Sequence, residues 1–305
     1  MTLDRRGSLR AGFDALRHRK LVLLLTGLTA VLGLIGATPL MPVFQRELAG
    51  TLAGDHFIRN APTLAPADFF DFVRFHRDAL SGVDRTAGFV GLLAVLQQAL
   101  IAGGIVVVLG RGRFTFSQFV EPARRNLWHN VKCLLLFAAA LAVVLGAWFA
   151  GTTAAFHRLL EDAPPESPGR TAAHWAILLI GLLLYGILSL VYDFARAARR
   201  YAPAIGAWQS VRFALRALRG SWMPALLLFG FWLAFGALAV AAGVGAAWLL
   251  PAVSLPALLL LFVVQVAALG LRSAVRVAAW GSYVGFLDAR ARPALASLTP
   301  WRSTP

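Results

Sequence analysis

The sequence predicts an all-α, polytopic membrane protein with six transmembrane helices arranged as three hairpins, each preceded by a cytoplasmic amphipathic helix. Three observations support this fold class: the composition, an internal repeat and the alternation of charge along the chain. Hydrophobic residues make up 59% of the 305 residues, and charged residues make up only 14%. Soluble domains carry about 25% charged residues, so the composition indicates an integral membrane protein.

The repeat unit consists of an arginine-bearing amphipathic stretch, a hydrophobic span, an outer loop and a second hydrophobic span. The three amphipathic stretches end at Lys20, Lys132 and Trp222, and each is followed at once by an apolar run. Internal periodicity of this kind is the signature of a repeat architecture. We expect a single transmembrane domain over residues 1–305, with a cytoplasmic tail at 286–305 and with repeats at about 7–110, 119–194 and 209–285.

Six apolar windows are each close to the 20 or so residues that a helix needs to cross the hydrocarbon core. They cover residues 21–44, 87–110, 133–153, 174–194, 223–250 and 256–276. The short PAVSLP connection between the last two predicts a tight antiparallel hairpin. The Phe-rich segment 66–80 in the first outer loop predicts a helix on the outer membrane surface or capping the bundle; its role is not predicted.

The formal net charge of +15 is distributed by loop. Every second segment is basic, with net charges of +4, +4, +5 and +4 over residues 1–20, 111–132, 192–221 and 272–305. The two intervening loops, 45–86 and 151–173, each carry a net charge of −1. Cytoplasmic loops of membrane proteins are enriched in Lys and Arg, so both termini are expected in the cytoplasm. Topology and anionic lipid account for the charge, and no nucleic-acid partner is expected.

The third amphipathic stretch is the clearest candidate for a lipid-binding surface. Its apolar residues recur at helical spacing: Trp208, Val211, Leu215, Leu218 and Trp222. A basic stripe follows beside them: Arg212, Arg216 and Arg219. We expect an in-plane interfacial helix with its arginines toward lipid phosphates; the alternative is a cytosolic connector whose apolar face packs under the bundle. Arg124 and Arg125 of the second stretch are further candidates for headgroup binding.

Polar residues within the spans are candidate functional residues, because each is costly in lipid unless paired. The candidates are Gln98, Tyr185, Ser189, Asp193, Arg196, Gln265, Arg272 and Arg276. Counting about 1.5 Å per residue places both glutamines near the midplane and Asp193 and Arg272 near the inner boundary. One interpretation is structural pairing of Gln98 with Gln265, and of Asp193 with Arg272 or Arg196. The other interpretations are a polar path or headgroup site, and arginines that only snorkel to the surface.

Small residues at every fourth position predict close helix packing. They form four stripes: Thr29, Gly33 and Ala37; Ala99 and Gly103; Ala237, Ala241 and Gly245; Ala239, Gly243 and Ala247. Two stripes on the fifth span indicate a central helix.

No pattern in the sequence identifies a reaction. GxSxG, Walker-type and GxGxxG elements are absent from the loops, and the histidines form no HxxxH pair. The single cysteine, Cys133, excludes an internal disulfide, and no Cys/His spacing suggests zinc. We therefore expect no catalytic residues, no metal site and no cofactor.

Three short motifs carry a resemblance to a widespread group of uncharacterised bacterial membrane proteins. They are Gly103-Gly104 at the end of the second span, Asp193 to Arg196 at the end of the fourth, and Gln265 before Arg272 in the sixth. The chain resembles, more loosely, the membrane domain fused to some bacterial glycerophosphodiester phosphodiesterases, whose catalytic domain has no counterpart here. The resemblance implies a six-helix membrane domain and no known activity.

The sequence favours a non-enzymatic, multi-pass protein of the bacterial inner membrane, acting as a scaffold or accessory subunit. Its basic interfacial helices are expected to bind anionic phospholipid or a membrane-protein partner. The alternative is a transporter or channel with a polar path near Gln98, Gln265, Asp193 and Arg272. An odd number of repeats argues against the two-fold inverted design of many secondary transporters. The substrate or partner and the oligomeric state are not predicted.

Overall fold

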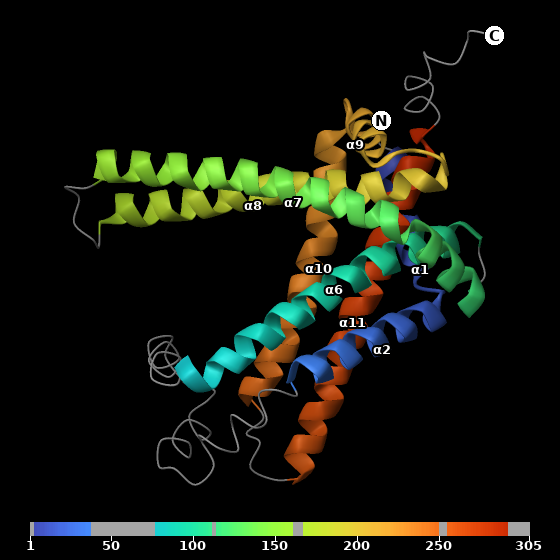
Figure 1. Cartoon of the computed structure of the whole chain (residues 1–305), viewed down its shortest axis with the longest axis horizontal. Coiled ribbons are helices and arrows are strands. Elements are labelled where there is room, and N and C mark those ends of the chain that lie inside the picture. Colours follow the sequence, from blue (N-terminus) through green and yellow to red (C-terminus); the bar gives the residue numbers. More distant parts are fainter. Residues whose placement is uncertain (1–2, 38–76, 112–113, 161–166, 250–254, 292–305) are drawn as a thin grey trace. The chain divides into compact units, whose positions relative to one another are not determined.

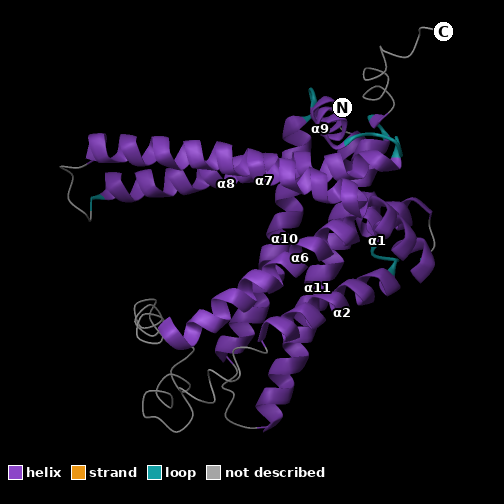
Figure 2. Cartoon of the chain, viewed as in Figure 1, coloured by secondary structure: helices purple, strands orange, loops and turns teal. Residues whose placement is uncertain are grey.

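The computed structural model describes residues 3–37, 77–111, 114–160, 167–249 and 255–291, and the helices of these ranges are coloured along the chain in Figure 1. Within them every regular element is helical, as Figure 2 shows. The elements are α1 (Leu3–Ala15), α2 (Arg19–Ala37), α6 (Arg77–Arg111), α7 (Phe116–Leu160), α8 (Pro168–Ala197), η2 (Ala198–Arg200), α9 (Ala207–Leu218), α10 (Trp222–Leu249) and α11 (Leu255–Asp288). The all-α prediction is confirmed for the described residues.

Five of the described helices are long and apolar enough to cross a membrane: α6, α7, α8, α10 and α11. The pair α1 and α2 makes a sixth if the two are counted as one span. The predicted span 21–44 is described as far as Ala37. Of the Phe-rich segment, residues 66–76 lie outside the described residues and residues 77–80 belong to α6. The chain is therefore a multi-pass membrane protein.

The second predicted amphipathic helix is not a separate element. α7 runs without interruption for 45 residues, from Phe116 through Pro122 and the whole predicted span to Leu160. The expectation of a separate helix before this span is wrong, because residues 123–145 contain neither the glycine nor the proline that ends most helices.

The first and third amphipathic stretches do form helices separate from their spans. α1 ends at Ala15, and α2 begins at Arg19 after a short turn. α9 is separated from α10 by Gly220, whose φ of 74° lies in the left-handed region that glycine adopts without steric cost. The structure thus confirms two separate helices of the three predicted.

The chain folds into two compact units. The first unit draws on residues 1–17, 99–233 and 277–305, and the second on 18–98 and 234–276. α7, α8, η2 and α9 lie wholly in the first unit, together with α1, the end of α6, the start of α10 and the end of α11. The first unit therefore contains α1 and α9, which the first and third amphipathic stretches form, and the start of α7, which the second forms.

In the first unit, α7 and α8 lie side by side as a long hairpin (Figure 1). The Trp148 indole donates a 3.2 Å hydrogen bond to the Ile177 carbonyl across the pair. Further along, the rings of Phe137 and Tyr192 stack with centroids 4.7 Å apart. Apolar side chains such as Val143 remain exposed on the outside of the hairpin, as expected of helices that face lipid.

Two glycine contacts bring α1 against the end of α11 in the first unit. A Cβ on Gly12 would collide with the Ser282 hydroxyl and lie 2.7 Å from the Ala278 carbonyl. A Cβ on Gly281 would lie 2.5 Å from the Cβ of Ala15. Because only hydrogen atoms fit between the two backbones here, the glycines allow the close approach that small residues give packed helices.

The end of α6 packs against the start of α7 through Gly103 and Gly104. A Cβ on Gly103 would lie 3.1 Å from the Cβ of Asn126, and one on Gly104 would lie 2.5 Å from the Phe119 ring. This contact confirms the close packing predicted from Ala99 and Gly103. It also gives the Gly-Gly motif a structural role at the turn from the second span.

In the second unit, α10 and α11 pack through the stripe that contains Ala239 and Gly243. Both residues are buried, and a Cβ on Gly243 would lie 3.1 Å from the Cβ of Ala268 in α11. The other predicted stripe on this helix is exposed at Ala237 and Ala241. Gly33 of the predicted first-span stripe has open space around its Cα. The structure therefore uses one of the two stripes on α10.

Candidate functional site

α9 has one buried face and one exposed face. The buried residues are Ser210, Phe213, Ala214, Ala217 and Leu218. This face packs against α7, α8 and η2 in the first unit. Of the predicted apolar row, Leu218 is buried, but Trp208 and Leu215 are 58% and 45% exposed, so the row does not pack as a whole under the bundle, as the alternative of a cytosolic connector requires. The structure buries a neighbouring row that includes small residues, which allow closer helix packing.

The opposite side of α9 presents aromatic, aliphatic and basic side chains together. We call this the α9 face, and it consists of Trp208, Arg212, Leu215, Arg216 and Arg219. All five are exposed, and the Arg212 guanidinium lies over the Trp208 ring, 5.6 Å from its centroid. The predicted basic stripe is confirmed as exposed, and it shares its surface with Trp208 and Leu215.

The first part of α7 carries a similar exposed row at four-residue spacing. Its members are Phe116, Val120, Arg124, Trp128 and Lys132. The ammonium group of Lys132 lies 5.6 Å from the centroid of the Trp128 ring. Arg124, a predicted headgroup ligand, thus lies on an amphipathic surface of the kind that binds at the membrane interface.

The neighbouring Arg125 lines a pocket in the first unit. The pocket has a volume of about 470 Å³ and lies between the end of α6, the start of α7 and η2. Its charged lining residues are Glu121, Arg125, Arg199 and Arg200. This volume is within the range of about 300–1,000 Å³ of small-molecule sites. Three guanidinium groups against one carboxylate make the pocket basic.

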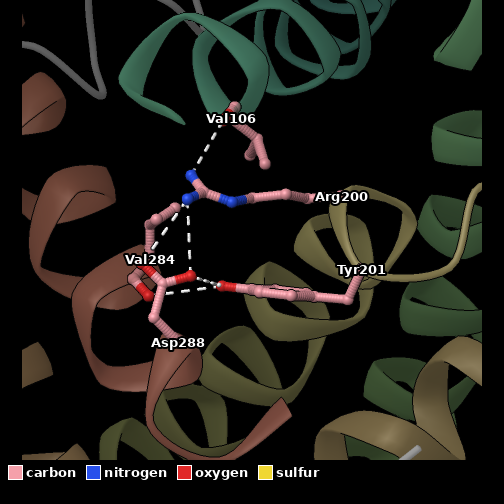
Figure 3. Close-up of polar contacts among 5 residues, drawn as sticks. All are labelled: Val106, Arg200, Tyr201, Val284 and Asp288. Atoms are coloured by element: carbon pink, nitrogen blue, oxygen red, sulfur yellow. Dashed lines mark hydrogen bonds and ion pairs between the residues drawn. The ribbon is translucent and has the colours of Figure 1, made fainter. Parts of the chain in front are cut away.

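Polar contacts fix two of these arginines to neighbouring helices. The Arg199 guanidinium donates a 3.1 Å hydrogen bond to the Asn126 side-chain oxygen in α7. Arg200 donates to the carbonyl of Val106 in α6 at 3.3 Å and lies 3.4 Å from the carboxylate of Asp288 in α11 (Figure 3). η2 therefore links three helices through its arginines.

The Tyr201 hydroxyl donates a 2.8 Å hydrogen bond to the same Asp288 carboxylate and lies 3.3 Å from the Val284 carbonyl (Figure 3). Burial, and then the negative charge of Asp288, raise the pKa of Tyr201 well above its ordinary value. Tyr201 therefore remains a neutral hydrogen-bond donor under physiological conditions and holds Asp288 beside Arg200.

The predicted residues Asp193 and Arg196 form an ion pair near the C-terminal end of α8. The Arg196 side chain is only 6% exposed, and its guanidinium lies over the rings of Tyr192 and Trp280, 4.0 and 5.0 Å from their centroids. Phe194, which follows Asp193 in the sequence, is fully buried, and its ring contacts that of Tyr283 in α11. Of the two partners proposed for Asp193, the structure thus places Arg196 beside it. Arg272 belongs to the second unit, and its pairing with Asp193 remains a prediction.

The remaining predicted intramembrane residues are spread along α6, α8 and α11. The Gln265 amide donates a 2.8 Å hydrogen bond to the Gly243 carbonyl of α10, a partner that the sequence did not indicate. Tyr185 contacts the Phe137 ring edge-on, with centroids 6.4 Å apart. Gln98 and Arg272 are exposed, and Ser189 and Arg276 are half-buried. The described contacts do not gather these residues into a common site.

The sequence did not indicate a buried cluster of His129, Cys133 and Ser210. The His129 imidazole nitrogen lies 3.3 Å from the Ser210 hydroxyl and 3.5 Å from the Cys133 thiol. All three residues are at most 5% exposed. A nucleophile beside a base resembles catalytic geometry, but the residues are buried and do not line the pocket, so their contacts stabilise the seam of α7 and α9. The four-residue spacing of His129 and Cys133 was the only signal.

The sequence also did not indicate a site role for Arg199, Arg200 and Glu121. These residues entered the prediction only through the net charge of their segments. No group of three metal-ligating residues is found in the part of the chain that the structure describes.

Comparisons with protein-family models, curated proteins and solved structures find no match to the chain.

Proposed function

We propose that this protein is a non-enzymatic scaffold or accessory subunit of the bacterial inner membrane, which engages anionic phospholipid through the α9 face. In this proposal six spans form three hairpins, with both termini in the cytoplasm. The single observation that carries the proposal is that α9 exposes Trp208 and Leu215 among three arginines while its opposite face is buried in the first unit.

The physical argument rests on where each type of side chain is stable. Tryptophan and leucine gain free energy at the boundary of headgroups and acyl chains. Each arginine near an anionic surface adds about 1 kcal/mol of electrostatic attraction. Because the other face of α9 is anchored by Phe213 and Leu218, the helix does not need to fold on binding and presents a preformed surface.

Two further observations support this proposal over a transporter or channel. Gln265, one of the two midplane glutamines of the polar-path interpretation, uses its amide to bond the α10 backbone. Asp193 and Arg196 neutralise each other within one helix turn. Both arrangements are those of residues that stabilise helix packing. The resemblance to bacterial six-helix membrane proteins supports the same location and span number.

A fluorescent label tests the lipid contact directly. Cys133 is the single cysteine of the sequence. A Cys133→Ala, Leu215→Cys variant therefore carries one thiol, which lies on the exposed α9 face. We expect an environment-sensitive dye at this position to shift to the blue when phosphatidylglycerol is added to phosphatidylcholine vesicles. The Arg212→Gln, Arg216→Gln, Arg219→Gln variant should lose that shift.

Arg170→Gln, at the opposite end of α8, is the control for net charge. If the dye responds equally to neutral and anionic vesicles, and the triple variant behaves like wild type, the α9 face does not recognise anionic lipid.

Membrane-impermeant thiol reagents test the topology. In intact cells, single cysteines introduced at residues 55–65 should be labelled, because this segment is proposed to lie outside. Cysteines at residues 205–215 should react only after the membrane is opened. Labelling of the second set in intact cells would reverse the proposed orientation.

A further inference from the structure

We propose that the pocket between α6, α7 and η2 is a second and separate site, which binds the phosphate group of a phosphate ester. The ester is the headgroup of an anionic phospholipid or a soluble molecule of the same chemistry. This site does not depend on the α9 face: none of the five residues of that face lines the pocket.

The charge of the pocket favours an anion. Arg125 and Arg199 form no ion pair among the described residues, and Arg200 shares Asp288 with Tyr201 at the edge of the pocket. Two guanidinium groups are therefore available without displacing a carboxylate. Arginine presents several N–H donors in one plane, a geometry that matches the oxygens of a phosphate.

The start of α7 adds to this field. α7 begins at Phe116, and Thr115 caps it by accepting a 3.3 Å hydrogen bond from the Gln118 backbone N–H. Ser117 and Gln118, in the first turn, line the pocket. The partial positive charge at a helix N-terminus favours a nearby anion, and here it acts on the same space as the three arginines.

Two polar atoms of the lining have no hydrogen-bond partner among the described residues. They are the side-chain oxygen of Gln118 and the Nε of Arg199, and both are buried. An unpaired buried polar group costs roughly 1–3 kcal/mol, so such groups are normally satisfied by a partner. A phosphate oxygen would accept from Arg199, and Gln118 with Glu121 would accept from a hydroxyl or ammonium group. The unpaired atoms therefore point to a phosphate ester whose alcohol part carries hydrogen-bond donors, such as glycerol phosphate.

Contacts with neighbouring helices hold Arg199 and Arg200 in place. Arg199 donates to Asn126 and Arg200 donates to Val106, and both partners belong to the pocket lining. Arg200 also pairs with Asp288, which accepts a hydrogen bond from Tyr201. Arginine side chains lose conformational entropy on binding, and this cost is smaller where the protein has already fixed them. The pocket is thus preorganised by three helices.

Titration calorimetry of the full-length protein in phosphatidylcholine nanodiscs tests the proposal, with sn-glycerol 3-phosphate as the soluble probe. A parallel set of nanodiscs containing phosphatidylglycerol, read by thermal unfolding, tests the lipid source. The variants are Arg125→Gln and Arg199→Gln. Arg124→Gln is the matched control, because it removes the same charge from the adjacent exposed position, which does not line the pocket.

We expect binding of at least one probe, and a loss of roughly tenfold or more in affinity for each pocket variant, as for removal of a hydrogen bond between charged groups. Arg124→Gln should retain wild-type affinity for sn-glycerol 3-phosphate. Binding of glycerol 3-phosphate shows that the pocket accepts a soluble ester. Stabilisation only by phosphatidylglycerol assigns the site to lipid if Arg125→Gln loses it and the α9 triple arginine variant keeps it.

The proposal is overturned if wild-type protein binds neither probe, if Arg124→Gln weakens binding of sn-glycerol 3-phosphate as much as Arg125→Gln, or if only phosphatidylglycerol stabilises the protein and Arg125→Gln leaves that effect unchanged. Arg125 is exposed and forms no ion pair among the described residues, so Arg125→Gln remains informative even if Arg199→Gln fails to fold. The α9 triple arginine variant should bind the soluble probe normally, which separates this site from the proposed lipid surface.

Discussion

The side-chain amide of Asn130 in α7 donates a 2.7 Å hydrogen bond to the backbone carbonyl of Ala99 in α6, and both residues are buried. The bond lies beside the contact of Gly103 with α7, where the two backbones come close. It therefore fixes the relative position of two helices that also form the pocket.

Replacing Asn130 with alanine should destabilise the protein by about 1–3 kcal/mol, the cost of a lost buried hydrogen bond. Unfolding of the purified protein by SDS in mixed micelles measures this change. Arg124→Gln, an exposed change on the same helix, should alter stability by less than about 0.5 kcal/mol. Equal effects of the two variants would show that the bond contributes nothing.

Gly281→Ala should destabilise the first unit by about 1–3 kcal/mol, as for overpacking of a tight contact. Its new methyl group would meet Ala15 and the Ala11 carbonyl of α1. In contrast, Gly146 of α7 has open space around it, so Gly146→Ala should stabilise the helix by up to about 1 kcal/mol. Thermal unfolding of both variants in detergent checks the opposite signs.

Alanine substitutions of single side chains should distinguish the two faces of α9. Phe213 is fully buried, and Phe213→Ala should cost about 3–5 kcal/mol because it leaves a cavity. Leu215→Ala, two residues away on the exposed face, should change stability in detergent by less than about 0.5 kcal/mol. A larger loss for Leu215→Ala would instead favour the alternative in which the face with Leu215 packs under the bundle.

Tyr201 should make stability fall at alkaline pH. Its pKa in the folded protein is raised above the unfolded value of about 10. The stability that it contributes is therefore fully present below about pH 10 and is lost as pH rises toward the folded pKa.

Tyr201→Phe removes this titration, so the difference in unfolding free energy between wild type and variant should shrink above about pH 10. Thermal unfolding from pH 8 to 11 measures it. Tyr185→Phe, on the α7–α8 hairpin, is the control. A constant difference between wild type and Tyr201→Phe across this range would rule out the effect.

The sequence by itself determined the helical class, the apolar spans and the alternation of basic segments. These properties depend on composition and on spacing within a segment. It also identified residues that matter for close packing, such as Gly103 and Gly243, because small residues at fourth positions are a local signal.

Only the tertiary structure decided which of two possible surfaces each helix buries. The pattern in α9 left open whether the face with Trp208 and Leu215 meets lipid or packs under the bundle, and the structure buries Phe213 and its small neighbours instead. Of the two stripes on α10, only the one with Ala239 and Gly243 packs on α11. In a membrane, lipid and protein neighbours are almost equally apolar, so hydrophobicity alone does not indicate which one a side chain contacts.

The pocket likewise needed the tertiary structure. Glu121 and Arg125 lie four residues apart on α7, but Arg199 lies far along the chain in η2, and no spacing rule joins it to them. Their proximity depends on where α8 ends relative to the turn between α6 and α7, which is set by long-range contacts such as those of Gly104 with Phe119 and of Arg199 with Asn126. Sequence periodicity describes each helix separately, whereas this site is created by the packing of three.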